Sequence, residues 1–129
     1  MTTIINQRPT TAQLREVISA SGLHRPTDSA HLAGMIAGGS EFRLAFADDQ
    51  IVGVLRALTD YTDVVYIAEL AVSADFQHQG IGRALVADLE ATLGPKLNYV
   101  LLASEVAQDY YQHLGYEPDP RGYFKPAQR

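Results

Sequence analysis

The sequence predicts an α/β fold in which a mixed, mainly antiparallel sheet of about six or seven strands lies between layers containing about four helices. Runs of apolar and β-branched residues alternate with segments of helical period along the chain. The stretch from Tyr66 to Val86 joins a strand, a glycine turn and a helix, which favours a right-handed parallel crossover. Because the chain has 129 residues, 47% of them hydrophobic, we expect one domain over residues 1–129.

The N-terminal third predicts one short strand and two helices. Leu14, Val17 and Ile18 form one apolar face of the first helix, and Gly22 ends it. The strand is expected over Met1 to Gln7, the first helix from a cap at Thr10 or Thr11 to about Ser21, and the second helix, capped by Asp28 or Ser29, over His31 to Ala37.

Three strands follow and feed the glycine turn. The turn at Asp48 to Gln50 separates the first two, which form a hairpin. The strands are expected over Glu41 to Ala47, Ile51 to Thr59 and Tyr66 to Val72.

The last part of the chain predicts two helices and three short strands. Gly94 and Pro95 end the first of these helices, and Gly115 ends the second. The helices are expected over Gly82 to about Leu93 and Glu105 to Leu114, and the strands over Tyr99 to Ala103, Tyr116 to Glu117 and Tyr123 to Phe124.

Composition excludes several functional classes. The formal net charge is −5, from 15 acidic and 10 basic residues, whereas nucleic-acid-binding proteins normally carry a basic face. We therefore expect no nucleic-acid partner. The chain has no cysteine, and its four histidines show no metal-ligand spacing, so we expect neither a thiol nucleophile nor a metal site. The absence of a long apolar run predicts a cytoplasmic protein without a membrane partner.

The glycine turn is the strongest functional signal. Glycine allows close approach of the backbone, and the first amides of a helix have no partner within it, so the turn and the helix start can bind phosphate oxygens. Neither of two known phosphate motifs fits. No Lys-Ser or Lys-Thr pair follows Gly82 as a Walker A loop requires, and Leu85 stands where a dinucleotide fingerprint has its third glycine.

The spacing Gln77-x-x-Gly80-x-Gly82 resembles the (R/Q)xxGxG/A signature of the GNAT family of N-acetyltransferases. The ELAV strand before it and DYYQHLGY at residues 109–116 resemble further family segments. The resemblance, which covers about residues 42–126, implies the acyl-CoA N-acyltransferase fold and acetyl-CoA as cofactor. It further implies that the pyrophosphate binds at Gln77, His78, Gln79, Gly80, Ile81, Gly82, Arg83 and Ala84, and that the rest of the cofactor contacts Leu70, Ala71, Val72, Ser104 and Tyr110.

The resemblance also implies two catalytic residues. Tyr111, four residues before Gly115, stands where the family places its tyrosine acid, and Glu69 stands where members often have a carboxylate base, acting directly or through water. Neighbouring helical residues point about 100° apart, so Tyr110 competes with Tyr111 for the cleft. A packed phenol and a hydrogen-bonded carboxylate remain the alternative interpretations of Tyr111 and Glu69. Asp60 and Tyr61, in the turn before the same strand, are candidate substrate-binding residues.

A narrower resemblance is to small bacterial GNAT proteins similar to chloroplast serotonin (arylalkylamine) N-acetyltransferases, carried by segments such as RALTD at residues 56–60. It implies a small primary amine on a hydrophobic or aromatic carrier, such as an arylalkylamine, as acceptor, attacked directly in a ternary complex, and a possible homodimer. An acyl-CoA-binding module without turnover, and a protein N-terminal or lysine acetyltransferase, stay open as alternatives.

Overall fold

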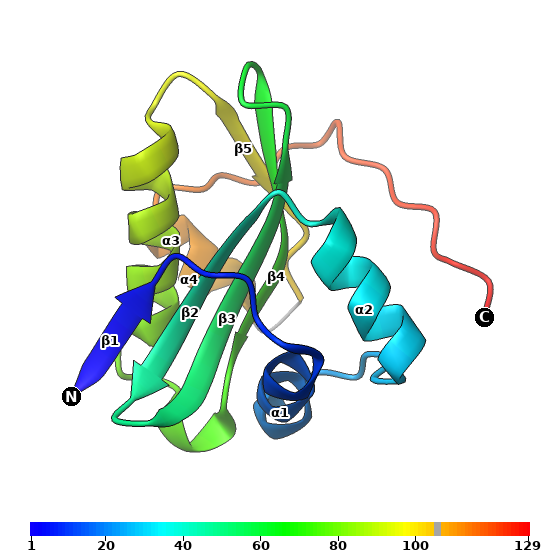
Figure 1. The fold of residues 1–129 in the computed structure, drawn as a ribbon. Coiled ribbons are helices and arrows are strands. Elements are labelled where there is room, and N and C mark those ends of the chain that lie inside the picture. The colour runs from blue at the N-terminus through cyan, green and yellow to red at the C-terminus, as the bar shows by residue number, and fades with distance from the viewer. Residues whose placement is uncertain (105–106) are drawn as a thin grey trace.

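Five strands form one mixed sheet in the computed structural model, which describes residues 1–104 and 107–129 (Figure 1). The strands are adjacent in chain order, antiparallel from the first to the fourth, and the fifth pairs parallel with the fourth. They are β1 (Thr2–Ile5), β2 (Glu41–Ala47), β3 (Gln50–Thr59), β4 (Val64–Val72) and β5 (Asn98–Leu101). The predicted fold class and the parallel crossover are confirmed.

Helices cover both faces of this sheet. In Figure 1, α1 (Thr11–Ser21) and α2 (Ser29–Gly38) lie on one face, and α3 (Ile81–Leu93) lies on the other with α4 (Gln108–His113) near it. A short 3-10 turn, η1 (Ala74–Phe76), connects β4 to the glycine turn. The crossover β4–α3–β5 therefore places the start of α3 close to the end of β4.

The predicted helix caps are confirmed. The Thr10 side chain accepts from the Gln13 amide, while the Gln13 side chain accepts from the Thr10 amide, which forms a capping box at α1. Gly22, with φ of 86°, ends α1 in the left-handed conformation. Asp28 caps α2 by accepting from the His31 amide. These local interactions fix the two ends of the α1–α2 loop.

The sheet has a separate apolar core on each face. The cluster under α3 contains Leu55, Leu85 and Leu89, and the cluster under α1 and α2 contains Leu14, Leu32 and Val54. At Gly53 a Cβ atom would lie 3.2 Å from side-chain atoms of Ala45, Ile81 and Leu85, so α3 packs closely against β3 there. This close packing positions the N-terminal end of α3 against the sheet.

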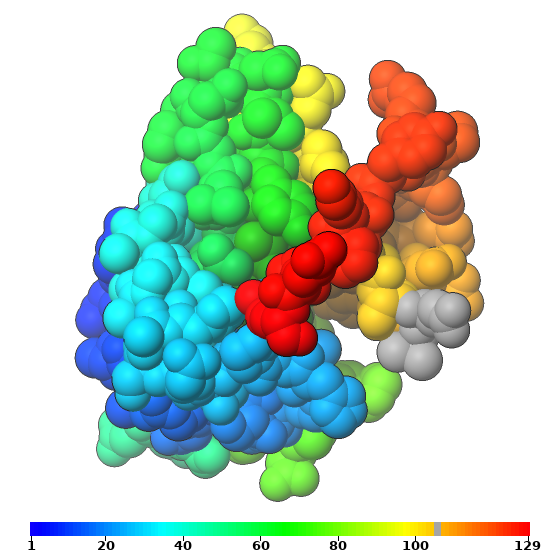
Figure 2. Space-filling view, turned by 90° about the vertical axis from the view of Figure 1, so that its right-hand side faces the viewer, coloured from blue at the N-terminus to red at the C-terminus, as the bar shows by residue number. Residues whose placement is uncertain are grey.

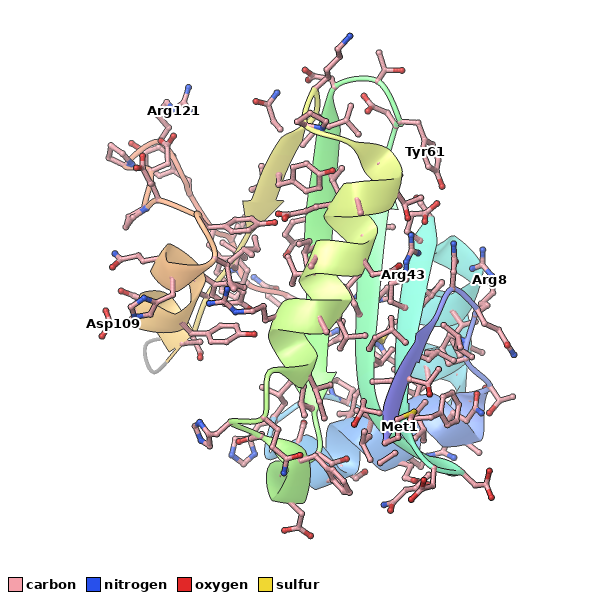
Figure 3. All side chains as sticks on the ribbon, turned by 90° about the vertical axis from the view of Figure 1, so that its left-hand side faces the viewer. Met1, Arg8, Arg43, Tyr61, Asp109 and Arg121 are labelled. Carbon is pink, nitrogen blue, oxygen red and sulfur yellow. The ribbon has the colours of Figure 1, made fainter. Side chains whose placement is uncertain are left out.

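A fully buried arginine crosses the layer beneath α3. Arg43 Nε lies 2.7 Å from Asp88 Oδ1, and its Nη1 donates to Glu41 Oε1 and to the Phe42 carbonyl oxygen. Figure 3 shows Arg43 between the sheet and α3, with Tyr61 above it. The ion pair ties β2 to the middle of α3.

The C-terminal part differs from the prediction. β5 ends at Leu101 rather than Ala103, α4 covers Gln108–His113, and no strand forms in residues 107–129, so the described sheet has five strands rather than six or seven. The Tyr116 amide donates back to the Tyr111 carbonyl at the end of α4, and the Arg121 amide bonds to the Asp119 side chain. Pro118 and Pro120 have no amide proton to give to a ladder. Glu105, the predicted start of the last helix, lies outside the described residues.

Candidate functional site

A β-bulge divides β4 into two parts that face opposite layers. The register of β3 with β4 shifts between the pairs Arg56–Glu69 and Ala57–Ile67, so Ala68 is the extra residue. Ile67 packs in the core under α3, whereas Ala71 packs in the core under α1 and α2. The bulge thus turns Glu69 toward the layer of α1 and α2.

The second half of β4 has an open edge. β5 pairs with β4 only from Val64 to Ile67, so among the described residues no strand adjoins the β5 side of residues 68–72. An extended ligand containing amides can take the place of such a missing strand. Leu70 and Val72 pack toward α3, and Ala71 is buried on the opposite face. Residues 68–72 are thus an edge that no described strand pairs, at the place where the pantetheine arm is predicted to lie.

The glycine turn presents unpaired amides next to this edge. His78 and Gly80 both have positive φ, 64° and 84°, which turns the chain sharply into α3. The Ala84 amide donates to the Gly80 carbonyl at 3.0 Å, and no described residue accepts from the amides of Ile81, Gly82 and Arg83. The Gln77, His78, Gln79 and Arg83 side chains are exposed around the turn. Helix starts of this kind bind phosphate.

Two side chains near the turn, Gln77 and Tyr110, make contacts within the protein that their spacing did not predict. Gln77 Nε2 donates to the Val72 carbonyl at 2.9 Å and to the Ser21 carbonyl at 3.2 Å, so it joins the end of α1 to β4. A Cβ atom on Gly82 would lie 2.5 Å from the Tyr110 hydroxyl oxygen. The structure therefore brings Tyr110, and not Tyr111, to the start of α3.

Glu69 is buried and paired with two arginines. Only 2% of Glu69 is exposed, and its Oε2 accepts from Arg25 Nη1 at 2.8 Å. Arg56 Nη2 lies 3.7 Å from Glu69 Oε1. Burial raises the pKa of Glu69 above its usual 4.5, and the two arginines oppose that rise. A carboxylate with a raised pKa is suited to accept a proton near neutral pH.

Asp60 and Tyr61 lie apart from Glu69, at the far end of β4. Asp60 Oδ1 accepts from the amides of Thr62, Asp63 and Val64, and these bonds, that of Asp63 first, lower its pKa to about 2. Tyr61 donates to Glu41 Oε2 at 2.6 Å, which raises the pKa of the phenol. The run of strand from Val64 to Glu69 spans about 17 Å. The role of Asp60 and Tyr61 in substrate binding stays a prediction, at a place distant from Glu69.

Tyr111 packs within a cluster of aromatic rings. Its ring meets those of Tyr110 and Tyr116 edge to face, with centroids 5.3 and 6.2 Å apart. Burial, and then the neighbouring Tyr110, raise the pKa of Tyr111 to about 12. Its phenol therefore stays protonated throughout the physiological range, as a hydrogen-bond donor must.

A hollow of about 570 Å³ lies beside β5, between that strand, α4 and the C-terminal segment. Tyr111, Tyr116, Tyr123 and Phe124 are among its lining residues, whereas Glu69 and the glycine turn are not. Figure 2 shows the C-terminal residues, in red, crossing this side of the molecule toward α1 and α2. Ser104, a predicted cofactor contact, is exposed and follows β5 in the chain.

Comparisons with known proteins agree with this geometry. Residues 13–124 match the family described as the acetyltransferase (GNAT) domain. The chain belongs to the GNAT family of N-acetyltransferases. A chloroplastic GCN5-related N-acetyltransferase 2 from Arabidopsis thaliana is 35% identical over 77 residues, 58% of this chain and 30% of that protein. A soybean (Glycine max) histone acetyltransferase is 33% identical over 75 residues, 57% of this chain and 32% of that protein.

Solved structures show the same GNAT fold. A Staphylococcus aureus protein described as a probable acetyltransferase superposes with a TM-score of 0.88 at 16% identity, over the whole of both chains. An aminoglycoside N-acetyltransferase in complex with CoA superposes with a TM-score of 0.74 at 20% identity, over 100% of this chain and 96% of that chain. This GNAT chain spans about a third of the length of the curated relatives that it matches.

No helix in the described part of this GNAT chain has the length and apolar character needed to cross a membrane. Sequence reasoning missed three features of its site: the bulge at Ala68, the pairing of Arg25 and Arg56 with Glu69, and the tie made by Gln77. One signal was available for Arg56, because it is the single charged residue in a mostly apolar strand. The Arg25 contact joins residues 44 apart in the chain and has no local signature.

Proposed function

We propose that this chain is an acetyl-CoA-dependent N-acetyltransferase that moves an acetyl group to a small primary amine by direct attack in a ternary complex. The observation that carries the proposal is the pairing of two features: the unpartnered amides at the start of α3, and the open edge of β4 directly before them. The first suits a pyrophosphate and the second a pantetheine arm. Family membership supports the same cofactor.

The residues present fit this cofactor. Gly82 puts no side chain over the start of α3, where the Tyr110 hydroxyl lies close to its backbone, and the amides of Ile81, Gly82 and Arg83 have no other described acceptor. Arg83 is exposed on the first turn of α3, where its guanidinium adds positive charge beside the phosphate site. In the proposed complex the main chain of Leu70 to Val72 hydrogen-bonds the amides of the arm, as the missing neighbouring strand would. Acetyl-CoA supplies the activated acyl group when bound.

In the proposed reaction the amine nitrogen attacks the thioester carbonyl carbon, a C–N bond forms and the C–S bond breaks. Glu69 accepts the proton that the amine loses, directly or through water, and Tyr111 donates a hydrogen bond or its proton to the departing sulfur. The chain contains no cysteine, so no thiol of the protein is available to carry the acetyl group. Arginines on both sides of Glu69 hold its carboxylate in place.

Thermal melting tests the cofactor first. Acetyl-CoA at a hundredfold over its Kd adds about 2.7 kcal/mol of stability, a rise of several degrees in Tm for a domain of this size. Dephospho-CoA and AMP serve as ligand controls. Gly82→Asp should abolish the rise because it puts a side chain and a negative charge into the phosphate site. Gly34→Asp, on an exposed face of α2 where a Cβ atom would have nothing within 4 Å, should keep it. An unchanged Tm at millimolar acetyl-CoA overturns the proposal.

A second candidate is an acyl-CoA-binding module without turnover, favoured by one observation. Glu69 is almost completely buried beneath Arg25, so in this conformation the proposed base has little access to an acceptor. This candidate predicts the same rise in Tm with acetyl-CoA but no release of free thiol with any amine.

A soybean relative named as a histone acetyltransferase supports a protein amine as an alternative acceptor. A cytoplasmic location and a homodimer stay proposals.

A further inference from the structure

Two arginines and one glutamate form a buried ionic cluster on the face of the sheet that α1 and α2 cover. Arg25 reaches it from the α1–α2 loop, Arg56 from β3 and Glu69 from β4, directly after the bulge. The side chains are 33%, 11% and 1% exposed, in that order. Arg25 is therefore the member that an incoming molecule meets first.

The cluster has more positive than negative charge. Two guanidinium groups face one carboxylate, and two further titratable groups act on two of them: His31 on α2 on Glu69, and Tyr66 on β4 on Arg56. This local excess contrasts with the chain as a whole, whose formal net charge is −5. A simple cationic amine would bring a further positive charge to a site that already has a surplus.

Hydrogen-bonding capacity is also left over. Glu69 Oε1 and Arg56 Nε are buried and have no hydrogen-bond partner among the described residues. Arg25 uses one guanidinium nitrogen for Glu69, so most of its five N–H donors are free of described acceptors. Buried polar atoms without partners are uncommon in folded proteins and need an explanation.

We propose that the acceptor is an amine whose carbon skeleton also carries an acidic group close to the nitrogen, such as an α-amino acid, and that Arg25 is the residue that selects it. The acidic group pairs with the guanidinium of Arg25, and the amine nitrogen approaches Glu69. Arg56 keeps Glu69 paired while Arg25 turns to the acceptor. Every contact then joins opposite charges: the acidic group of the zwitterion meets Arg25, its amine meets Glu69, and Glu69 meets Arg56.

This inference rests on the proposed acetyl transfer and narrows its substrate. It departs from the plain arylalkylamine that the sequence resemblance implied, because such an amine has no group for the surplus guanidinium. An acceptor with an acidic group also differs from the polycations that other enzymes acetylate. If Arg25 served only to neutralise Glu69, its removal would lower activity toward all amines equally. A change in the ratio of kcat/KM between acidic and neutral amines is the result that a merely structural role of Arg25 does not produce.

The experiment measures free thiol release from acetyl-CoA with matched acceptors, after a Tm rise with acetyl-CoA has been recorded for each protein. Each set contains an amino acid, its carboxamide and its decarboxylated amine: for example phenylalanine, phenylalaninamide and phenethylamine, with the leucine and histidine sets beside it. We expect kcat/KM for the amino acid to exceed that for the carboxamide by about tenfold or more, the size of one charge-assisted contact.

Arg25→Gln should reduce this preference to about one, mainly through KM for the amino acid, and Arg25→Lys should keep part of it. Lys96→Gln, which removes the same charge from the exposed α3–β5 connection, should keep it in full. The ratio of kcat/KM between amino acid and carboxamide in the wild type tests the proposed class of acceptor even if Arg25→Gln folds poorly. Equal or better use of the neutral amines, or an unchanged ratio in a folded Arg25→Gln, overturns the proposal. So does binding of acetyl-CoA with no turnover of any amino acid. Failure of acetyl-CoA to raise Tm overturns the proposed function itself.

Discussion

The hydroxyl oxygen of Tyr110 lies 2.5 Å from the position that a Cβ atom on Gly82 would occupy. The first turn of α3 and the short helix α4 are therefore in contact at the start of the proposed phosphate site, and no side chain fits on Gly82 unless Tyr110 moves. The next nearest atom, Tyr110 Cζ, would be 3.5 Å away, which is an ordinary contact. The obstruction is thus the phenolic oxygen alone.

A double-mutant cycle tests this contact. Gly82→Ala should cost about 1 kcal/mol more of unfolding free energy in the wild-type background than in Tyr110→Phe, because removing the hydroxyl removes the overlap. In the Phe background alanine's helical preference over glycine should show instead. Denaturant unfolding measures each corner of the cycle. Gly34→Ala, with nothing near its Cβ position, should behave alike in both backgrounds. Equal effects of Gly82→Ala in the two backgrounds would contradict the contact.

Arg43 should be one of the most sensitive positions for stability. Its side chain is fully buried with two carboxylate partners, and its Nη2 atom has no described partner. Arg43→Ala should lower the free energy of unfolding by about 3–5 kcal/mol, from the lost ion pairs and the cavity. Asp88→Asn should cost much less, because Asp88 is 43% exposed and Arg43 keeps Glu41. Urea denaturation of both variants checks the order, and a larger loss for Asp88→Asn would contradict it.

Local signals predicted most of the fold, and long-range contacts account for what they missed. Thr10, Gly22 and Asp28 act on their own neighbours in the chain, so caps and helix ends were predictable. The bulge at Ala68 depends on how β3 pairs with β4. The two strands expected after Gly115 needed hydrogen-bonded neighbours, and the segment that contains Pro118 and Pro120 forms no strand.

The same distinction holds for the site. The glycine turn is a local motif, and the structure has it with the positive φ that glycine permits at Gly80 and a second positive φ at His78. The identity of the groups around Glu69 follows from tertiary packing: Arg25 is 44 residues away in the chain. Which of Tyr110 and Tyr111 faces the start of α3 likewise depends on how α4 packs, and spacing alone favoured Tyr111 for the cleft. Motif spacing therefore predicts the proposed cofactor end of the site from local sequence, whereas the groups around Glu69 follow only from the tertiary structure.

Asp60 should stabilise the β3–β4 turn in a pH-dependent way. Its pKa of about 2 in the folded protein is below the usual 3.8, so its contribution is complete above the unfolded value and is lost as pH falls through the folded value. The difference in Tm between wild type and Asp60→Ala should therefore be present at pH 6 and shrink between pH 4 and pH 2. Asp49→Ala, in the β2–β3 turn, is the matched control. A difference that stays constant down to pH 2 would be the contrary result.

Glu69 should control the acidic limb of the rate profile. Because its pKa is raised above 4.5 by burial, kcat/KM should rise with pH through a midpoint above that value as the carboxylate loses its proton. Arg25 opposes the rise in pKa, so Arg25→Gln should move the midpoint to higher pH. Glu69→Gln should lower kcat by about a hundredfold and remove this limb. Steady-state rates from pH 4 to 9 test both, with Lys96→Gln as the charge-matched control. An acidic limb retained in Glu69→Gln would assign it to another group.

Tyr111 and Tyr110 should separate in kinetics although they are neighbours. Tyr111→Phe should lower kcat by about tenfold to a hundredfold with little change in the Kd of acetyl-CoA, because the hydroxyl is proposed to act on the sulfur as it leaves. Tyr110→Phe should instead alter acetyl-CoA affinity, since its hydroxyl lies at the start of α3. With a pKa of about 12, Tyr111 keeps its proton up to pH 10, so its ionisation should cause no fall in kcat below that pH. Stopped assays and thermal titration with acetyl-CoA distinguish the two variants, and a kcat loss confined to Tyr110→Phe would transfer the acid role to that residue.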